Sequence, residues 1–350
     1  MNRMMKFLPA LLLLVSAGVA AQNWTPANLQ VVDEYAIPVY QQLSLATREL
    51  QKQTRQFCVR PDAKQLNQTL SRYHDVMDSW QKAQLLRLGP AELFMRHFRM
   101  EMWPDRHNTG AKQLRKLRAE QNMEKLQADN FSGASIAVQG LPAMERLLFA
   151  QGVTASDFSE NGKGNYNCAL LEAISANLAA IAGELLDEWQ GQYRAAIASP
   201  SEDNDYFLTD KEAAGQFLNQ LYTQLQFITD QKLKRPLGEK RFRLKRAESW
   251  RSQRSLRNIR LDLESARQLY AIAFAPMLKD LKLKKDIDAQ FENVMKQGRA
   301  LSMPLKKAQE EHPEALAQWQ RDISKLKRSI GMKLPNALEL PLGFNSLDGD

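Results

Sequence analysis

Apolar residues recur at intervals of three and four along most of the chain, which is the spacing of one buried helix face. In residues 28–57, for example, Leu29, Val32, Leu43 and Leu50 follow this spacing. The same pattern recurs in residues 63–88, 111–130, 168–198, 209–233, 252–278, 284–303 and 306–330. Strand-like alternation and β-hairpin turns are absent from the sequence pattern. The pattern predicts an all-α protein of antiparallel helical bundles.

Proline, glycine and capping residues divide this helical pattern. Pro38 is expected to kink the first helix because proline lacks an amide hydrogen. Asp62 is a good N-cap for the second helix, and Gly89-Pro90 is a stop signal. Thr209, with Glu212 three residues later, predicts a capping box.

Residues 1–21 have the three parts of a secretory signal peptide. Arg3 and Lys6 are basic, residues 7–15 are apolar, and residues 17–21 are small, before Gln22. The apolar run is too short to span a bilayer comfortably. We therefore expect export to the periplasm and no membrane span after cleavage. Removing Arg3 and Lys6 lowers the formal net charge from +8 to +6.

Residues 199–205, SPSEDND, are the best candidate for a domain boundary because they contain no apolar side chain. We expect an N-terminal helical domain over residues 22–200. A C-terminal helical-bundle domain would then follow over residues 201–350.

Cys58 and Cys168 are the only cysteines. In an oxidising compartment an even count favours one disulfide, and the alternative is two buried free thiols. A bond between them would close a loop of about 110 residues, for which the chain-entropy model gives about 4.7 kcal/mol. The absence of a CxxC motif argues against a thiol redox function.

The stretch from Ser132 to Ala150 places one carboxylate, Glu145, between Pro142 and an apolar run. Pro142 fits the first turn of a helix, and Glu145 one turn later is favoured by the helix dipole. On these residues alone, the stretch is a helix start with an apolar face. Any further role for Glu145 depends on the rest of the chain.

Residues 91–110 combine aromatic and charged side chains around a break at Trp103-Pro104-Asp105. Phe94, Phe98 and Trp103, beside Arg87 and Asp105, would form the wall of a polar pocket. The alternative is a packed corner between helices with an Arg–Asp pair.

Residues 232–260 carry twelve Lys and Arg against Glu239 and Glu248. This run is either an anion-binding surface or a solvated loop and helix face. Phe242 and Trp250 are too few for a base-stacking platform, and an exported protein does not meet nucleic acid. We therefore expect no nucleic-acid partner.

Several catalytic classes are excluded by missing motifs. The chain has no Gly-rich phosphate loop, no Gly-x-Ser-x-Gly elbow and no His-Glu-x-x-His pair. His97 and Glu101 are four residues apart, but two ligands do not complete a metal site. The remaining histidines are His74, His107 and His312.

A set of short motifs in a particular order resembles the imelysin family (peptidase M75 group), and its periplasmic or lipoprotein branch most closely. The motifs are Phe57-Cys58, Trp80 followed by residues 86–90, Trp103-Pro104-Asp105, residues 140–149 and residues 343–350. The resemblance implies two helical-bundle domains, export, and an iron-regulated role in iron or other metal acquisition.

The family motif is Gly-x-His-x-x-Glu, whose His and Glu face one pocket and could bind a metal. Here residues 140–145 are GLPAME, so Gly140 and Glu145 match but Pro142 replaces the His. Glu145 stays the one motif residue that could ligate a divalent metal or iron. The resemblance thus implies the fold and the pocket but argues against catalysis.

Two hypotheses follow. The first is a non-catalytic periplasmic binding or accessory protein linked to iron or metal uptake, whose partner is a small ligand or a periplasmic or outer-membrane protein. Its pocket would be built around Glu145, Gly140, Trp80, Arg87, Trp103 and Asp105. The second is a metallopeptidase whose missing imidazole is supplied by His74, His97 or His107.

Overall fold

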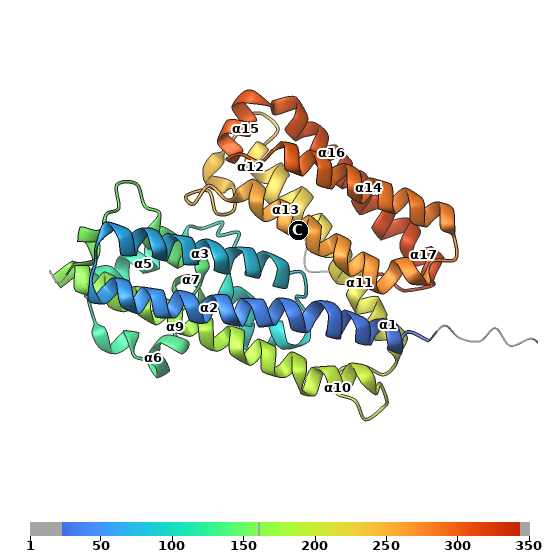
Figure 1. Cartoon of the computed structure of the whole chain (residues 1–350), viewed down its shortest axis with the longest axis horizontal. Helices are drawn as coiled ribbons and strands as arrows, with labels where there is room; N and C mark the ends of the chain where they lie inside the picture. Colours follow the sequence, from blue (N-terminus) through green and yellow to red (C-terminus); the bar gives the residue numbers. More distant parts are fainter. Residues whose placement is uncertain (1–22, 160–161, 344–350) are drawn as a thin grey trace, which may run out of the picture.

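The computed structural model describes residues 23–159 and 162–343. These residues form helices and connecting loops without a strand, which confirms the all-α prediction. Figure 1 shows two bundles, one made of α1 to α10 and the other of α11 to α17. The predicted signal peptide, and residues 344–350 of the last motif of the family resemblance, fall outside the described residues.

Three long helices form the body of the first bundle: α2 (Ile37–Val59), α3 (Ala63–Ala83) and α9 (Gly162–Gln190). Tyr40 of α2 stacks on Trp189 of α9, with ring centroids 5.8 Å apart. Two shorter helices extend this body at one end: α1 (Thr25–Gln30) and α10 (Gln192–Ala198). The other end carries α5 (Thr109–Glu120), α6 (Ala128–Ser132), α7 (Ile136–Gln139) and α8 (Leu141–Leu148), whereas α4 (Arg96–Met100) lies along α9, with Arg96 paired to Glu184 and Glu188.

Trp319 lies in the core of the second bundle, where its Nε1 donates to the carbonyl oxygen of Val294 at 2.8 Å. Tyr270 stacks on Phe291 in the same core, with centroids 5.4 Å apart. Its helices are α11 (Asp210–Phe227), α12 (Arg235–Leu237), α13 (Ser255–Leu269), α14 (Leu281–Ala300), α15 (Leu305–Glu311), α16 (Pro313–Arg328) and α17 (Leu334–Leu338).

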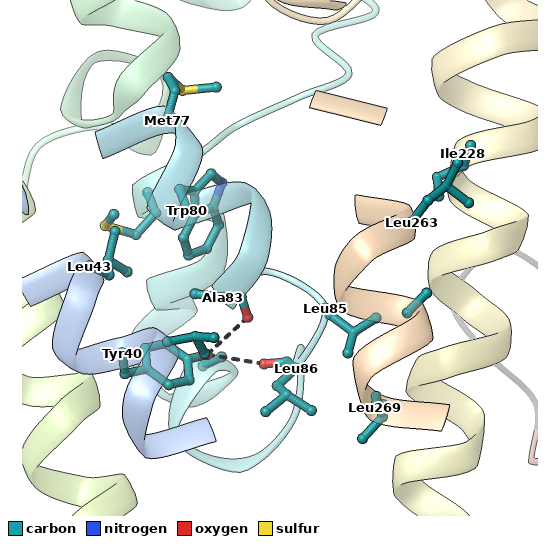
Figure 2. Packing of buried hydrophobic residues seen from close by; sticks show 14 of the residues in the cluster. Tyr40, Leu43, Met77, Trp80, Ala83, Leu85, Leu86, Ile228, Leu263 and Leu269 are labelled. Atoms are coloured by element: carbon teal, nitrogen blue, oxygen red, sulfur yellow. Dashed lines mark hydrogen bonds between the residues drawn. The ribbon is translucent and has the colours of Figure 1, made fainter. Parts of the chain in front are cut away.

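The two bundles share one continuous apolar core. Figure 2 shows Leu85 of the first bundle between Tyr40 and Trp80 on one side and Leu263 and Leu269 of the second bundle on the other. The hydroxyl of Tyr40 donates to the carbonyl oxygen of Leu86, 3.3 Å away, and so connects α2 to the loop that follows α3. Residues 199–209 connect the bundles, but the division into domains at residue 200 stays a prediction.

Four wide helical turns of the π type each end two residues before a proline. Proline has no amide hydrogen and its ring clashes with the carbonyl four residues earlier, so a wider turn relieves the conflict. The disturbance predicted at Pro38 takes this form. The turns are Val31–Ala36, Ile228–Lys234, Tyr270–Phe274 and Ser329–Lys333, before Pro38, Pro236, Pro276 and Pro335.

The predicted N-caps at Asp62 and Thr209 hold, but the capping box is incomplete and α3 ends at Ala83, before the predicted stop at Gly89-Pro90. Asp62 accepts a hydrogen bond from the amide of Gln65 at 2.8 Å, and Thr209 accepts one from the amide of Glu212 at 3.1 Å. The carboxylate of Glu212, however, accepts from the amide of Leu208 and not from that of Thr209.

Several helix boundaries differ from the sequence prediction. The helix predicted over 306–330 is divided at His312, whose backbone (φ −137°, ψ 47°) lies outside the helical region that a residue before proline avoids. The helix predicted over 111–130 ends at Glu120, because Gln121 takes a left-handed conformation (φ 50°). Helix α9 begins at Gly162, six residues before the helix predicted over 168–198.

Residues 162–198 have the length and apolar composition of a membrane span. In the fold this segment packs along α2, with Leu170, Leu178 and Leu185 fully buried. Its apolar residues are therefore accounted for by the core of the first bundle.

Candidate functional site

The motif helix α8 begins at a glycine that is required by close packing. A Cβ on Gly140 would lie 2.5 Å from the carbonyl oxygen of Met100 and 2.6 Å from that of Arg99. Both are backbone atoms, so they cannot move aside cheaply. Gly140 therefore positions α8 against α4 and does not line a cavity.

Gly140→Ala is expected to lower the free energy of unfolding by about 1–3 kcal/mol, the usual cost of overpacking. Chemical denaturation would measure it. Gly183→Ala in α9 is the matched control, since a Cβ there meets nothing within 4 Å. The control should be neutral or stabilising by up to about 1 kcal/mol, because alanine favours helix. Equal losses in both variants would contradict this account.

Glu145 joins the motif helix to the second half of the chain. Its Oε1 accepts two hydrogen bonds from Ser252, one from the amide at 2.9 Å and one from the hydroxyl at 2.7 Å. Burial raises the pKa of Glu145 above its usual range, while the hydrogen bonds from Ser252 oppose that shift. Glu145 is thus a buried acceptor that holds the loop before α13.

A cavity of about 500 Å³ lies beside Glu145, between the two halves of the chain. Trp103, Asp105 and Glu145 of the predicted pocket line it, together with Pro142. The remaining predicted pocket residues, Gly140, Trp80 and Arg87, are not on its wall. The second half contributes Arg235, Lys245, Arg246, Ala247, Ser249, Trp250 and Arg251.

Asp105 organises the segment that follows Trp103-Pro104. Its carboxylate accepts from the amides of Thr109 at 2.8 Å and Gly110 at 2.9 Å, at the start of α5. Arg146 of α8 lies 3.7 Å from the same carboxylate. The segment is therefore a packed corner with an Arg–Asp pair, and its Trp103 and Asp105 line a polar cavity. Phe94 and Phe98, predicted on the same wall, are instead 74% and 48% exposed and do not line it.

Trp80 and Arg87 lie at the junction of the bundles. The indole of Trp80 is buried and donates to Oε2 of Glu101 at 2.7 Å. The guanidinium of Arg87 stacks over the ring of Phe227, 4.2 Å from its centroid, and donates to Gln84. Neither residue lines the cavity.

A buried ammonium group lies at this junction. Nζ of Lys232 is 2.6 Å from Asp262, 2.9 Å from Glu248 and 2.7 Å from Oε1 of Gln81. The Lys232, Glu248 and Asp262 side chains are all at most 2% exposed. The sequence alone does not reveal this cluster, because Lys232 and Glu248 stand in a basic run that predicts an exposed surface.

Two buried carboxyl groups near Lys232, those of Glu101 and Asp262, have raised pKa values. Burial, and then the neighbouring Glu248, raise the pKa of Glu101 to about 8. Burial also raises the pKa of Asp262 to about 7, against the pull of Lys232. Burial alone would lower the pKa of Lys232, but the surrounding carboxylates raise it, so the ammonium stays charged.

The histidines considered as substitutes lie off the cavity wall. Nδ1 of His74 is 3.0 Å from Nη1 of Arg254, and burial lowers the pKa of His74 to about 4. His97 is packed on Trp80 with ring centroids 5.2 Å apart, and burial holds its pKa well below the usual range. His107 is exposed on the loop before α5.

The residues at the motif do not fit a metal ion. Pro142 offers no ligand atom, and Oε1 of Glu145 already accepts two hydrogen bonds from Ser252. Over residues 23–159 and 162–343, no three His, Cys, Asp or Glu side chains come together in a set that could hold a metal. The cluster of carboxylates at the junction surrounds the ammonium of Lys232 instead.

The basic segment 232–260 has three different environments. Lys232 is buried, whereas Lys245 and Arg246 are exposed on the cavity wall. Arg254 and Arg257 both bind Asp78 of α3. Neither of the two interpretations from sequence describes the whole segment.

The predicted disulfide is confirmed: Cys58 at the end of α2 is bonded to Cys168 of α9. It lies far along the first bundle from the junction with the second, and Phe57 beside it packs edge-on against Phe158. The bond therefore reinforces the long-helix body that carries the motif helix.

The chain is an all-helical protein of two bundles, with the motif from Gly140 to Glu145, at the start of helix α8, beside their junction. The family model described as Imelysin matches residues 36–330, and the chain belongs to this family. No curated protein matches the chain.

Two solved structures share the fold. One is an imelysin-like protein from Psychrobacter arcticum 273-4, with a TM-score of 0.76 and 17% identity over 93% of this chain and 100% of that one. The other is named as a putative iron-regulated protein A precursor from Parabacteroides distasonis ATCC 8503. It has a TM-score of 0.73 and 14% identity, over 89% of this chain and 95% of that one.

Proposed function

We propose that this imelysin-family protein is a non-catalytic periplasmic binding or accessory protein that takes a small ligand in the cavity beside Glu145. The observation that carries the proposal is the cavity itself. Its volume of about 500 Å³ is in the range of small-molecule sites, and both halves of the chain contribute to its wall.

The chemistry of the wall argues for binding over hydrolysis. A metallopeptidase needs a metal ion, or another means, to activate water. Pro142 stands where the family has its imidazole, and Glu145 is occupied by Ser252. Without a ligand set for a metal at the motif, the residues present suit recognition of a ligand.

The link to iron or metal uptake and the periplasmic location are part of the same proposal. One structural relative bears the name of an iron-regulated protein precursor, and this chain begins with the pattern of a signal peptide. In this proposal any metal reaches the protein with its own ligands, because the motif supplies too few.

Metal analysis and peptidase assays on the purified protein test the proposal. We expect background metal content after incubation with Zn²⁺ or Fe³⁺ and removal of unbound ion, and no hydrolysis of a protein substrate. Glu145→Ala and the isosteric Glu145→Gln should give the same values. Stoichiometric metal with hydrolysis, both abolished in Glu145→Gln, would instead establish a metallopeptidase with a non-standard site.

A further inference from the structure

Six basic side chains line the cavity beside Glu145. Arg106 and Arg146 come from the first half of the chain, and Arg235, Lys245, Arg246 and Arg251 from the second. A ligand held between them would touch both halves.

The acids on the same wall are already engaged. Asp105 accepts from two backbone amides, and Glu145 accepts twice from Ser252. Glu101 accepts from the indole of Trp80. The three carboxylates are fewer than the six cations, and one of them, Asp105, already pairs with Arg146 at 3.7 Å.

The cations lie close enough to repel one another. Burial lowers the pKa of Arg235, and the charges of Arg106 and Arg246 lower it further. Burial and then Arg146 lower the pKa of Arg251 in the same way. An anion in the cavity would relieve this repulsion among the cations.

We propose that the cavity binds a small, multiply charged organic anion, carrying several carboxylate or phosphate groups, through the cations of both halves. This inference rests on the proposed function and specifies the ligand of the same cavity. Two sources share the chemistry: the free anion, and its anionic complex with ferric iron. Trp103 and Trp250 add flat apolar surface to the wall.

Binding of four probes by titration calorimetry tests the inference. The probes are citrate, ferric citrate, pyrophosphate and a neutral acetylated and amidated tripeptide. We expect at least one anion to bind, with an affinity that falls as salt is raised, since the interactions are ionic. Binding of ferric citrate without free citrate or pyrophosphate would identify the iron complex as the source.

Charge variants locate the site. Lys245→Gln/Arg246→Gln removes two exposed cavity cations, so the fold should be unaffected, and the affinity for the anion should weaken about tenfold or more for each ion pair that is removed. Lys285→Gln/Arg299→Gln removes the same charge from exposed positions of α14 and should leave the affinity unchanged.

The remaining outcomes overturn the inference. These are binding of the neutral tripeptide alone, no binding of any anion at millimolar concentration, or equal weakening in the two charge variants. Tripeptide binding would leave the proposed binding function standing and refute only the anionic ligand. Metal-dependent hydrolysis would refute the proposed function itself.

Discussion

Lys232→Ala is expected to lower the free energy of unfolding by about 3–5 kcal/mol, the cost of removing one partner of a buried ion pair. The ammonium contacts Asp262, Glu248 and Gln81, and its side chain is 1% exposed. Its removal leaves two buried carboxylates facing each other with no cation between them. Urea unfolding of the wild type and the variant would measure the loss of stability.

Two further variants separate this effect from a general cost of losing lysine. Lys285→Ala, at an exposed position of α14, should change the stability by less than about 0.5 kcal/mol. Lys232→Met/Asp262→Asn removes one excess carboxylate together with the ammonium and should be less destabilised than the sum of its single variants. Strict additivity would contradict the buried pair.

Removing the disulfide with Cys58→Ser/Cys168→Ser is expected to cost about 2–5 kcal/mol. The bond joins positions 110 residues apart, so it restricts a large loop of the unfolded chain. Denaturation of the wild type with and without a thiol reductant, beside the double variant, would measure it. The reductant should destabilise only the wild type; equal curves for all samples would show that the bond contributes nothing.

The cavity was predictable only in part. Trp103, Asp105 and Glu145 could be selected because they stand in short motifs, and these three do line one wall. Trp80 was selected by the same argument but serves the core at the bundle junction. A short motif can therefore select a residue without showing whether its side chain lines the cavity or packs in the core.

Contacts between distant segments account for what sequence reasoning missed. Lys232 meets Gln81 across 151 residues, and Glu145 meets Ser252 across 107. No local pattern pairs such residues, since their proximity follows from how the bundles dock. The basic run therefore looked like a solvated surface, although part of it is buried and part lines the cavity.

The sequence by itself determined the helical class and the family, and it favoured the disulfide that the structure then confirmed. These depend on helical periodicity, on a single pair of cysteines and on short motifs, all of which are local. Only the tertiary structure decided that Glu145 is an acceptor for Ser252, that an ammonium is enclosed by carboxylates, and that cations of both halves share a cavity. The physical reason is that burial and charge balance belong to the packed bundles and not to any one segment.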